Sequence, residues 1–216
     1  MREKVEAKRA CHIVITAGPT REYLDPVRFL SNPSTGKMGF ELARAAVRRG
    51  HRVTLIAGPV SLKTPKGVTR IDVVSAREML RAVEDAIEPQ TLFISTAAVA
   101  DWRPLICANQ KLKKSQMSDT LKLVRNPDIL ATVQARVKVG FAAETGAVAQ
   151  EAQRKMKTKG LALIVANDVT QKGVGFGTPT NKVDLFYADG RQESLPLMTK
   201  RALGNRLVRI CENLCS

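Results

Sequence analysis

Six apolar segments of strand length recur along the chain, and amphipathic segments of helical length lie between most of them. The apolar segments are CHIVITAG (11–18), RVTLIAG (52–58), RIDVVS (70–75), TLFISTAAVA (91–100), KVGFAA (138–143) and LALIVAND (161–168). Strands that are apolar throughout are typical of parallel sheets, whose two faces are covered by the helices that connect them. The pattern therefore predicts an α/β fold of the Rossmann-like, doubly wound type with a mainly parallel sheet.

Local signals place further elements within one domain. The chain has 216 residues and no internal repeat, which predicts a single domain over 1–216. Ser75 and Glu78 have the spacing of a capping box, and Asn126 is expected to cap a helix that begins at Pro127. The segment VDLFYADGRQESLPL predicts a C-terminal hairpin with its turn at Asp189-Gly190, and a final helix is expected from about Thr199.

Composition narrows the functional classes. Thirty-five Lys and Arg residues against 20 Asp and Glu residues give a net charge of +15, which attracts anions. Aromatic residues make up only 4% of the chain, and no RNA-binding signature or zinc finger is recognisable, so nucleic-acid binding is retained only as an alternative. No apolar run is long enough for a membrane span or a signal peptide, which predicts a cytoplasmic protein.

The cysteines and histidines do not suggest a metal centre. The four cysteines contain no CxxC pair, so neither a zinc site nor a disulfide framework is expected. His12 opens an expected strand and His51 follows Gly50, where a helix is expected to end. Both histidines are therefore expected to be structural.

Residues 18–50 read almost like a phosphate-binding loop that leads into a helix. A P-loop requires Gly-x4-Gly-Lys-Ser/Thr, but Ser31 occupies the position of the first glycine and Met38 follows Lys37. The Gly-x-Gly-x-x-Gly template fits 34–39 if serine replaces its first glycine, which predicts an anion site at the start of a helix near Met38. An ordinary NAD site is disfavoured because these glycines do not directly follow the first strand and the second strand ends in IAGPV, without an acidic residue. A nicotinamide-dependent oxidoreductase remains the alternative enzyme.

The connection from Pro19 to Thr35 is unusually long for an α/β unit. It carries Arg21, Asp25, Arg28 and Asn32. Connections of this length are usually functional, so we expect this loop to contribute to the site.

Six motifs together resemble a known enzyme family. They are, in order, ITAGPTREYLDPVRFLSNPSTGKMGFELA, STAAVADWRP, KLKK, NPDIL, VGFAAET and ANDV. In this order they closely resemble phosphopantothenoylcysteine synthetase, the second activity of the bacterial bifunctional coenzyme A biosynthesis flavoprotein, from about residue 11 to the C-terminus. No segment resembles the flavin-dependent decarboxylase half, so no flavin is expected on this chain, which is expected to be a stand-alone synthetase or an excised domain.

The resemblance implies a two-step ligation. The carboxylate of 4′-phosphopantothenate attacks the α-phosphorus of CTP, giving an acyl-cytidylate and pyrophosphate, and the amine of L-cysteine then displaces CMP. Mg²⁺ is expected to be bridged mainly by the triphosphate, with no protein ligands assigned. A homodimer is expected, in which 170–197 either completes the partner's site or forms a local flap, and a separate flavin-dependent decarboxylase is a candidate partner.

The resemblance also assigns residues to the two substrates. For CTP these are Ser95, Thr96, Ala97, Asp101, Lys111, Pro127, Asp128, Ile129, Leu130, Phe141, Lys155 and Lys159. For phosphopantothenate they are Arg28, Asn32, Gly36, Lys37, Met38 and Gly39. Lys155 and Lys159 are four residues apart on one expected helix face, so both can reach one anion.

Arg28, Asn32 and Lys111 are the expected catalytic residues. Lys111 follows the fourth strand and its loop, so it is expected to overhang the carboxyl end of the sheet and stabilise the triphosphate. Asp101 is expected at the end of that strand. Asn32 is expected to donate a hydrogen bond to the oxyanion that forms when cysteine attacks, and Arg28 is expected to reach the reacting acyl group or its phosphate.

Overall fold

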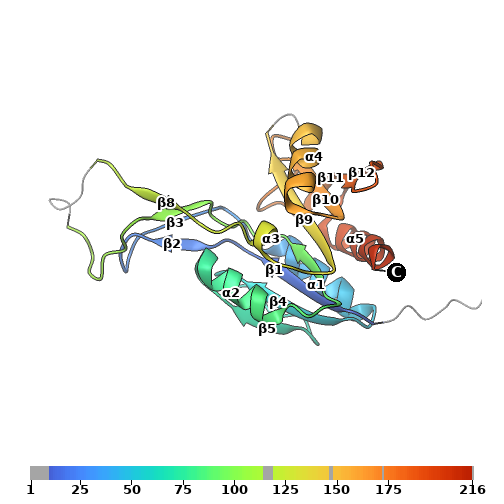
Figure 1. Cartoon of the computed structure of the whole chain (residues 1–216), viewed down its shortest axis with the longest axis horizontal. Helices are drawn as coiled ribbons and strands as arrows, with labels where there is room; N and C mark the ends of the chain where they lie inside the picture. Colours follow the sequence, from blue (N-terminus) through green and yellow to red (C-terminus); the bar gives the residue numbers. More distant parts are fainter. Residues whose placement is uncertain (1–9, 114–118, 146–147, 172, 216) are drawn as a thin grey trace, which may run out of the picture.

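An eight-stranded sheet forms the centre of the computed structural model, which describes residues 10–113, 119–145, 148–171 and 173–215. Its strand order is β12-β11-β10-β9-β6-β1-β4-β5 (Figure 1). Six neighbouring strands run parallel: β1 (His12–Ala17), β4 (Arg52–Ala57), β5 (Thr69–Asp72), β6 (Leu92–Ser95), β9 (Val137–Glu144) and β10 (Leu163–Asp168). The α/β, mainly parallel fold predicted from the apolar segments is confirmed.

Helices cover both faces of the sheet because successive side chains of a strand point to opposite faces. Ile13 and Ile15 of β1 pack in the core beneath α1 (Lys37–Arg48) and α5 (Lys200–Leu214). Val14 faces the other way, into the core with α2 (Ala76–Ala86) and α3 (Ile129–Thr132). α4 (Val148–Lys159) covers β9 and β10 on this second face. No helix in the described part of the chain has the length and apolar composition needed to cross a bilayer.

The C-terminal hairpin extends the sheet by two antiparallel strands, β11 (Thr180–Tyr187) and β12 (Gln192–Thr199). Its turn contains Gly190 at φ 90°, and Asp189 accepts a hydrogen bond from the Arg191 N–H at 3.0 Å. The Thr199 hydroxyl caps α5 by accepting from the Ala202 N–H at 3.2 Å. The predicted hairpin, turn and final helix are confirmed.

The two predicted helix starts have different outcomes. The capping box is confirmed: the Ser75 hydroxyl accepts from the Glu78 N–H at 3.2 Å, and the Glu78 carboxylate accepts from the Val74 N–H at 2.9 Å. The cap at Asn126 is wrong, because the Asn126 amide donates to the Ala100 carbonyl at 2.8 Å instead. Asp128 caps α3 by accepting from the Ala131 N–H, so Pro127 precedes the helix.

The fourth expected strand is shorter than its apolar run. β6 ends at Ser95 because the chain then crosses over the end of β1, where the Ala98 N–H donates to the Gly18 carbonyl at 2.9 Å. Asp101 therefore does not end a strand; it lies in the exposed segment that follows. The apolar residues Ala97 and Val99 pack against the core cluster beneath α2, so this segment is apolar without being a strand.

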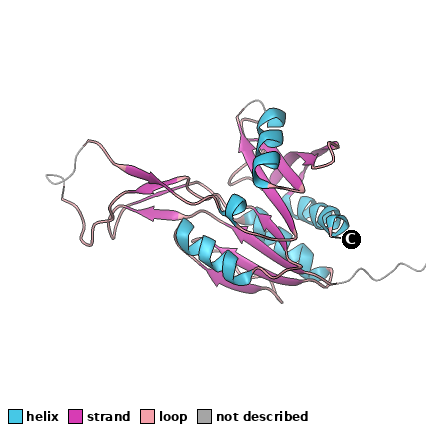
Figure 2. Cartoon of the chain, in the orientation of Figure 1, coloured by secondary structure: helices cyan, strands magenta, loops and turns pink. Residues whose placement is uncertain are grey.

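Two short hairpins form an arm that extends away from the sheet, on the left of Figure 2. One hairpin pairs β2 (Arg21–Tyr23) with β3 (Phe29–Ser31), and the other pairs β7 (Trp102–Pro104) with β8 (Leu123–Arg125). The expected loop from Pro19 to Thr35 is thus partly strand. Most of the exposed large apolar side chains of the described chain lie on this arm: Val27, Phe29, Trp102, Leu105, Ile106, Leu121 and Leu123.

Candidate active site

The start of α1 forms a cradle for an anion. Gly36 precedes the helix at φ 75°, a left-handed conformation that favours glycine. Among the described residues no side chain caps this helix, and its first turn contains no acidic residue. The first N–H groups of α1 and the positive end of its dipole are therefore available to a negatively charged group, which is typical of phosphate sites.

Gly39 allows this cradle to sit directly over the ends of β1 and β6. A Cβ atom at Gly39 would lie 2.5 Å from the Ala17 Cβ and 2.6 Å from the Thr96 Oγ1. Only a glycine permits such a close approach of helix and strand. The cradle consequently lies at the carboxyl ends of parallel strands, where ligands bind in doubly wound folds.

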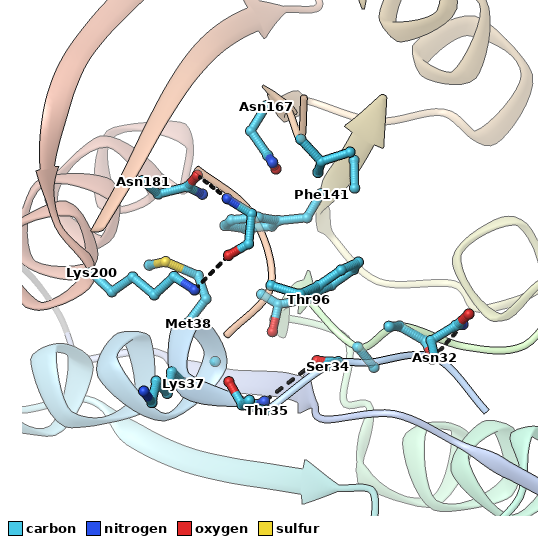
Figure 3. A pocket seen from close by; sticks show the side chains of 18 of the residues that line it. Asn32, Ser34, Thr35, Lys37, Met38, Thr96, Phe141, Asn167, Asn181 and Lys200 are labelled. Carbon is cyan, nitrogen blue, oxygen red and sulfur yellow. Dashed lines mark hydrogen bonds between the residues drawn. The ribbon is translucent and has the colours of Figure 1, made fainter. Parts of the chain in front are cut away.

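A cavity of about 290 Å³ opens in front of the cradle (Figure 3). On one side it is lined by Asn32 and by 34–39. Across the cavity lie Asn167, Asn181 and Lys200. The structure therefore brings together all of the residues expected to bind phosphopantothenate except Arg28.

The far wall contains polar groups that the sequence reasoning missed. The Lys200 ammonium donates to the Gly175 carbonyl at 2.9 Å, and the Asn181 Oδ1 accepts from the Gly175 N–H at 3.3 Å. These two bonds fix the loop that closes this side of the cavity. Burial lowers the pKa of Lys200, and the positive charge of Lys37 lowers it further, so an anion between the two lysines would relieve their repulsion.

Asn167 is the strongest indication of a ligand. It lies near the end of β10, and its Nδ2 is buried without a hydrogen-bond partner among the described residues. A buried amide without a partner is unfavourable by about 1–3 kcal/mol, so this donor is available to a bound molecule. The signal in the sequence was the ANDV motif, in which the first polar side chain follows a buried run. Asn181 and Lys200 carry no comparable local signal.

A second cavity, of about 430 Å³, adjoins the first. Ala97 and Phe141 line both cavities. The second cavity is lined by most of the residues expected to bind CTP: Ser95, Ala97, Asp101, Pro127, Asp128, Ile129, Leu130, Phe141 and Lys159. Thr96 lines only the first cavity, where its hydroxyl donates to the Thr16 carbonyl at 2.6 Å.

The two lysines of α4 make different contacts. The Lys159 ammonium lies 2.8 Å from the Asp128 Oδ2, and both residues line the second cavity. The Lys155 ammonium lies 2.5 Å from the Glu144 Oε1 at the end of β9, and Lys155 lines neither cavity. The structure thus places Lys159 with the expected nucleotide residues, while Lys155 is one helical turn away.

Asn32 lies at the edge of the first cavity with its amide group engaged. The Nδ2 donates to the carbonyl groups of Ala98 at 3.2 Å and Val99 at 3.4 Å. These bonds connect the long first loop to the segment that leads into the second cavity. Within the described residues, the Asn32 Oδ1 makes no hydrogen bond, so it is the group that can contact a ligand first.

Arg28 and Lys111 lie on the arm, and neither lines either cavity. The Arg28 guanidinium pairs with the buried Asp25 carboxylate and donates to the Leu112 carbonyl at 2.9 Å. The Leu112 N–H donates to the same carboxylate at 3.2 Å. Lys111 is exposed beside this contact and does not overhang the carboxyl end of the central sheet, because the segment after β7 runs along the arm. Lys114, the last residue of the KLKK motif, lies outside the described residues.

The described part of the region 170–197 contributes to the wall of the first cavity of its own chain. Val169, Gly175, Phe176 and Asn181 line the first cavity, and β11 pairs with β10 of the same sheet. Of the two alternatives left open for this region, the geometry favours the local one.

Both histidines take part in structural contacts. The His51 Nε2 lies 2.8 Å from the buried Glu212 carboxylate, which also pairs with Arg49. The His12 Nε2 lies 2.9 Å from the Thr54 hydroxyl. Within the described residues, no group of three His, Cys, Asp or Glu side chains is arranged to hold a metal ion.

Comparison with known proteins identifies the family. Residues 9–214 match the family described as DNA/pantothenate metabolism flavoprotein C-terminal domain. The coenzyme A biosynthesis bifunctional protein CoaBC of Vibrio vulnificus (strain YJ016) is 49% identical over 209 residues, which cover 94% of this chain and 52% of that protein. Its counterpart in Escherichia coli (strain K12) is 50% identical over 205 residues, which cover 91% and 50%.

A solved structure agrees with these sequence matches. The crystal structure of the C-terminal domain of coenzyme A biosynthesis bifunctional protein CoaBC has a TM-score of 0.79 and 37% identity, covering 96% of this chain and 97% of that chain. The chain spans about half the length of the curated relatives it matches. The resemblance seen in the six motifs is confirmed over nearly the whole chain, which belongs to the DNA/pantothenate metabolism flavoprotein C-terminal domain family.

Proposed function

We propose that this chain is a phosphopantothenate–cysteine ligase of coenzyme A biosynthesis that uses CTP. The observation that carries the proposal is the pair of adjoining cavities that share Ala97 and Phe141. One cavity has an uncapped helix N-terminus that suits a phosphate, and the other holds the family's nucleotide motifs. Two substrates bound in these cavities would meet near the shared wall.

In the proposed first step, the phosphate of 4′-phosphopantothenate lies at the start of α1 and its carboxylate reaches the shared wall. The carboxylate oxygen attacks the α-phosphorus of CTP, the bond to the β-phosphate oxygen breaks, and pyrophosphate leaves. Catalysis of such a step depends on positioning and on positive charge near the phosphates. Lys37, Lys200 and Lys159 supply that charge from the body of this chain.

In the proposed second step, the neutral amine of L-cysteine attacks the acyl carbon, the bond from that carbon to the phosphate oxygen breaks, and CMP leaves while the nitrogen releases a proton to solvent. Asn32 lies at the edge of the first cavity, and its Nδ2 is held by hydrogen bonds to the carbonyl groups of Ala98 and Val99. Its Oδ1 can accept a hydrogen bond from the incoming amine, and its Nδ2 can turn to the oxyanion once the substrate displaces a carbonyl contact. An amide suits this place because it adds no charge to a site that already contains phosphates.

CTP is proposed to bind as its magnesium complex, with Mg²⁺ as part of the substrate. The described residues supply no cluster of ligands for a resident metal ion, so no step is assigned to one. A cytoplasmic location and a separate flavin-dependent decarboxylase as partner remain proposals.

A homodimer is proposed because two expected catalytic residues lie on the arm, apart from the rest of the site. The arm exposes Phe29 and Ile106, with 39% and 77% of their surfaces accessible. Exposed apolar patches of this kind mark protein interfaces. If the arm of one copy lies against the body of another, Arg28 and Lys111 would complete the partner's cavities.

Complementation tests this arrangement. Lys111→Gln and Asn32→Asp are each expected to lower ligase activity by at least about 10²-fold. Co-expressing the two variants should restore roughly a quarter of the activity, because one site in each mixed dimer then combines an intact arm with an intact body. If dimers that are shown to contain one copy of each variant recover no activity, the proposal that the arm of one copy completes the partner's site is contradicted.

The ligase itself is tested by mixing the protein with 4′-phosphopantothenate, Mg²⁺ and CTP. Pyrophosphate release is expected, turnover should require cysteine, and ATP should be much poorer, because a base of the wrong hydrogen-bonding pattern leaves buried groups without partners. Equal rates with ATP would contradict the CTP assignment. No pyrophosphate with any nucleotide would contradict the ligase.

A further inference from the structure

Four arginines line a groove outside the two cavities. It lies between α2 and the base of the arm and has a volume of about 480 Å³. Leu80 and Pro127 provide its apolar lining. The charged lining consists of Arg77, Arg81, Arg103, Arg125 and the single acidic residue Glu84. The groove is therefore strongly positive, with one carboxylate against four guanidinium groups.

The two arginines on α2 are arranged unfavourably in the absence of an anion. Arg77 and Arg81 are four residues apart, so they lie one turn apart on the same face of the helix, and both are exposed. Like charges at this spacing destabilise a helix. Neither forms an ion pair within the described residues, whereas the exposed Arg154 of α4 pairs with Glu151 three residues before it.

Packing does not explain these two side chains. α2 buries Ala76, Met79 and Val83 against the sheet, and this stripe leaves the arginine face to solvent. Their positions are therefore free to serve a ligand.

The two arginines on the arm are held in place. The Arg103 Nη1 donates to the Arg125 carbonyl at 2.5 Å and to the Asn126 Oδ1 at 3.0 Å. The Arg125 guanidinium lies over the Trp102 ring, 5.0 Å from its centroid. Such contacts reduce the number of conformations that the side chains lose on binding.

We propose that this groove binds a multiply charged phosphate of the inorganic pyrophosphate class. Guanidinium groups match the oxygens of phosphate with two parallel hydrogen bonds, and several of them suit an anion that carries charge at both ends. Arg125 and Pro127 also line the second cavity, so the groove opens beside the proposed nucleotide site. The proposal concerns binding alone and does not require turnover.

Trp102 provides a direct probe, because it is the only tryptophan of the chain and Arg125 lies on its ring. Titration with pyrophosphate at low ionic strength, where exposed charges are least screened, should change its fluorescence. Isothermal titration calorimetry on the same protein checks the affinity. No fluorescence change together with no heat would overturn the proposal.

The decisive variant is Arg77→Gln/Arg81→Gln, since neither arginine lines the second cavity. Loss of two charged donors should weaken pyrophosphate binding roughly 10- to 100-fold. The matched control is Arg201→Gln/Arg209→Gln, which removes the same charge from exposed positions on α5, on the opposite face of the sheet. The control should bind pyrophosphate within about twofold of the parent, because the proposed contacts are local.

Four further outcomes are informative. Unchanged affinity in the α2 variant would overturn the proposal, because the measured site would then lie elsewhere. Equal weakening in both variants would also overturn it and indicate attraction to net charge. Binding lost in the α2 variant while ligase turnover persists would support the groove, and binding retained by a parent protein without ligase activity would refute only the proposed function.

Discussion

Replacing Gly39 by alanine is expected to lower both the stability of the protein and its affinity for a phosphate at the start of α1. The new Cβ would lie 2.5 Å from the Ala17 Cβ, 2.6 Å from the Thr96 Oγ1 and 3.3 Å from the Ala17 Cα. Carbon atoms in contact normally lie about 3.5–4.0 Å apart. The first turn of α1 must therefore move away from the sheet.

Two opposing effects determine the magnitude. Helix propensity alone would favour alanine over glycine by up to about 1 kcal/mol. Overpacking costs about 1–3 kcal/mol, and loss of the hydrogen bond from the Thr96 hydroxyl to the Thr16 carbonyl would add about 1 kcal/mol. Ala17 cannot move aside because it is fully buried in β1, which lies between β4 and β6. The steric effect should therefore win, with a net loss of about 1–3 kcal/mol.

Calorimetric melting measures the stability part of this prediction. A loss of this size corresponds to a decrease in Tm of roughly 2–12 °C for a chain of this length. Binding of 4′-phosphopantothenate, measured by titration calorimetry, should weaken in the same variant because the N–H groups of the cradle are displaced.

Gly190→Ala is the matched control. Its Cβ would meet nothing within 4 Å, but φ is 90°, so alanine should cost stability through backbone strain alone. This control should leave phosphopantothenate binding unchanged because it lies in the β11–β12 turn. A Gly39→Ala protein that melts at or above the parent temperature and binds normally would refute the packing argument.

Three other substitutions test separate parts of the molecule. Lys111→Gln should slow pyrophosphate release by roughly 10²–10³, because it removes a positive charge proposed to stabilise the triphosphate. Tm should not change, because the side chain is exposed. Asn32→Asp should reduce ligation to cysteine by at least about 10² while the acyl-cytidylate accumulates in rapid-quench experiments. Asp25→Asn should make the free energy of unfolding fall less steeply as the pH is lowered. Its partner Arg28 lowers the pKa of the Asp25 carboxyl, so below about pH 4 the unfolded chain takes up a proton that the folded chain does not.

Each substitution has an outcome that contradicts its reasoning. A fully active Lys111→Gln enzyme would make Lys111 an ordinary solvated residue. Equal loss of both half-reactions in Asn32→Asp, without a trapped intermediate, would make Asn32 a positioning residue for the loop. Parallel acid-unfolding curves for Asp25→Asn and the parent would show that this carboxylate is not linked to acid stability.

Local sequence patterns determined the central architecture. Apolar runs separated by helical segments specify strands that are buried on both faces, so the alternation of strands and helices along the chain and the mainly parallel sheet could be predicted. Three short signals that act within four residues, Ser75 with Glu78, Asp189-Gly190 and Thr199, are confirmed, whereas the cap expected at Asn126 is formed by Asp128. Most of the residues that line the second cavity could be predicted, but through the family resemblance and not through periodicity.

The arrangement of the site depended on contacts between distant parts of the chain. β6 stops at Ser95 because the loop after β1 offers competing hydrogen bonds, which no pattern within 91–100 encodes. On the arm, residues 24–28 form hydrogen bonds with residues 108–112. These bonds hold Lys111 away from both cavities, although its position after a strand had suggested that it would overhang the sheet. Asn167 and Lys200 line the same cavity although they belong to different elements. Periodicity records which side of an element is buried, whereas the partner of each buried or polar group is chosen only when the sheet and its helices pack together.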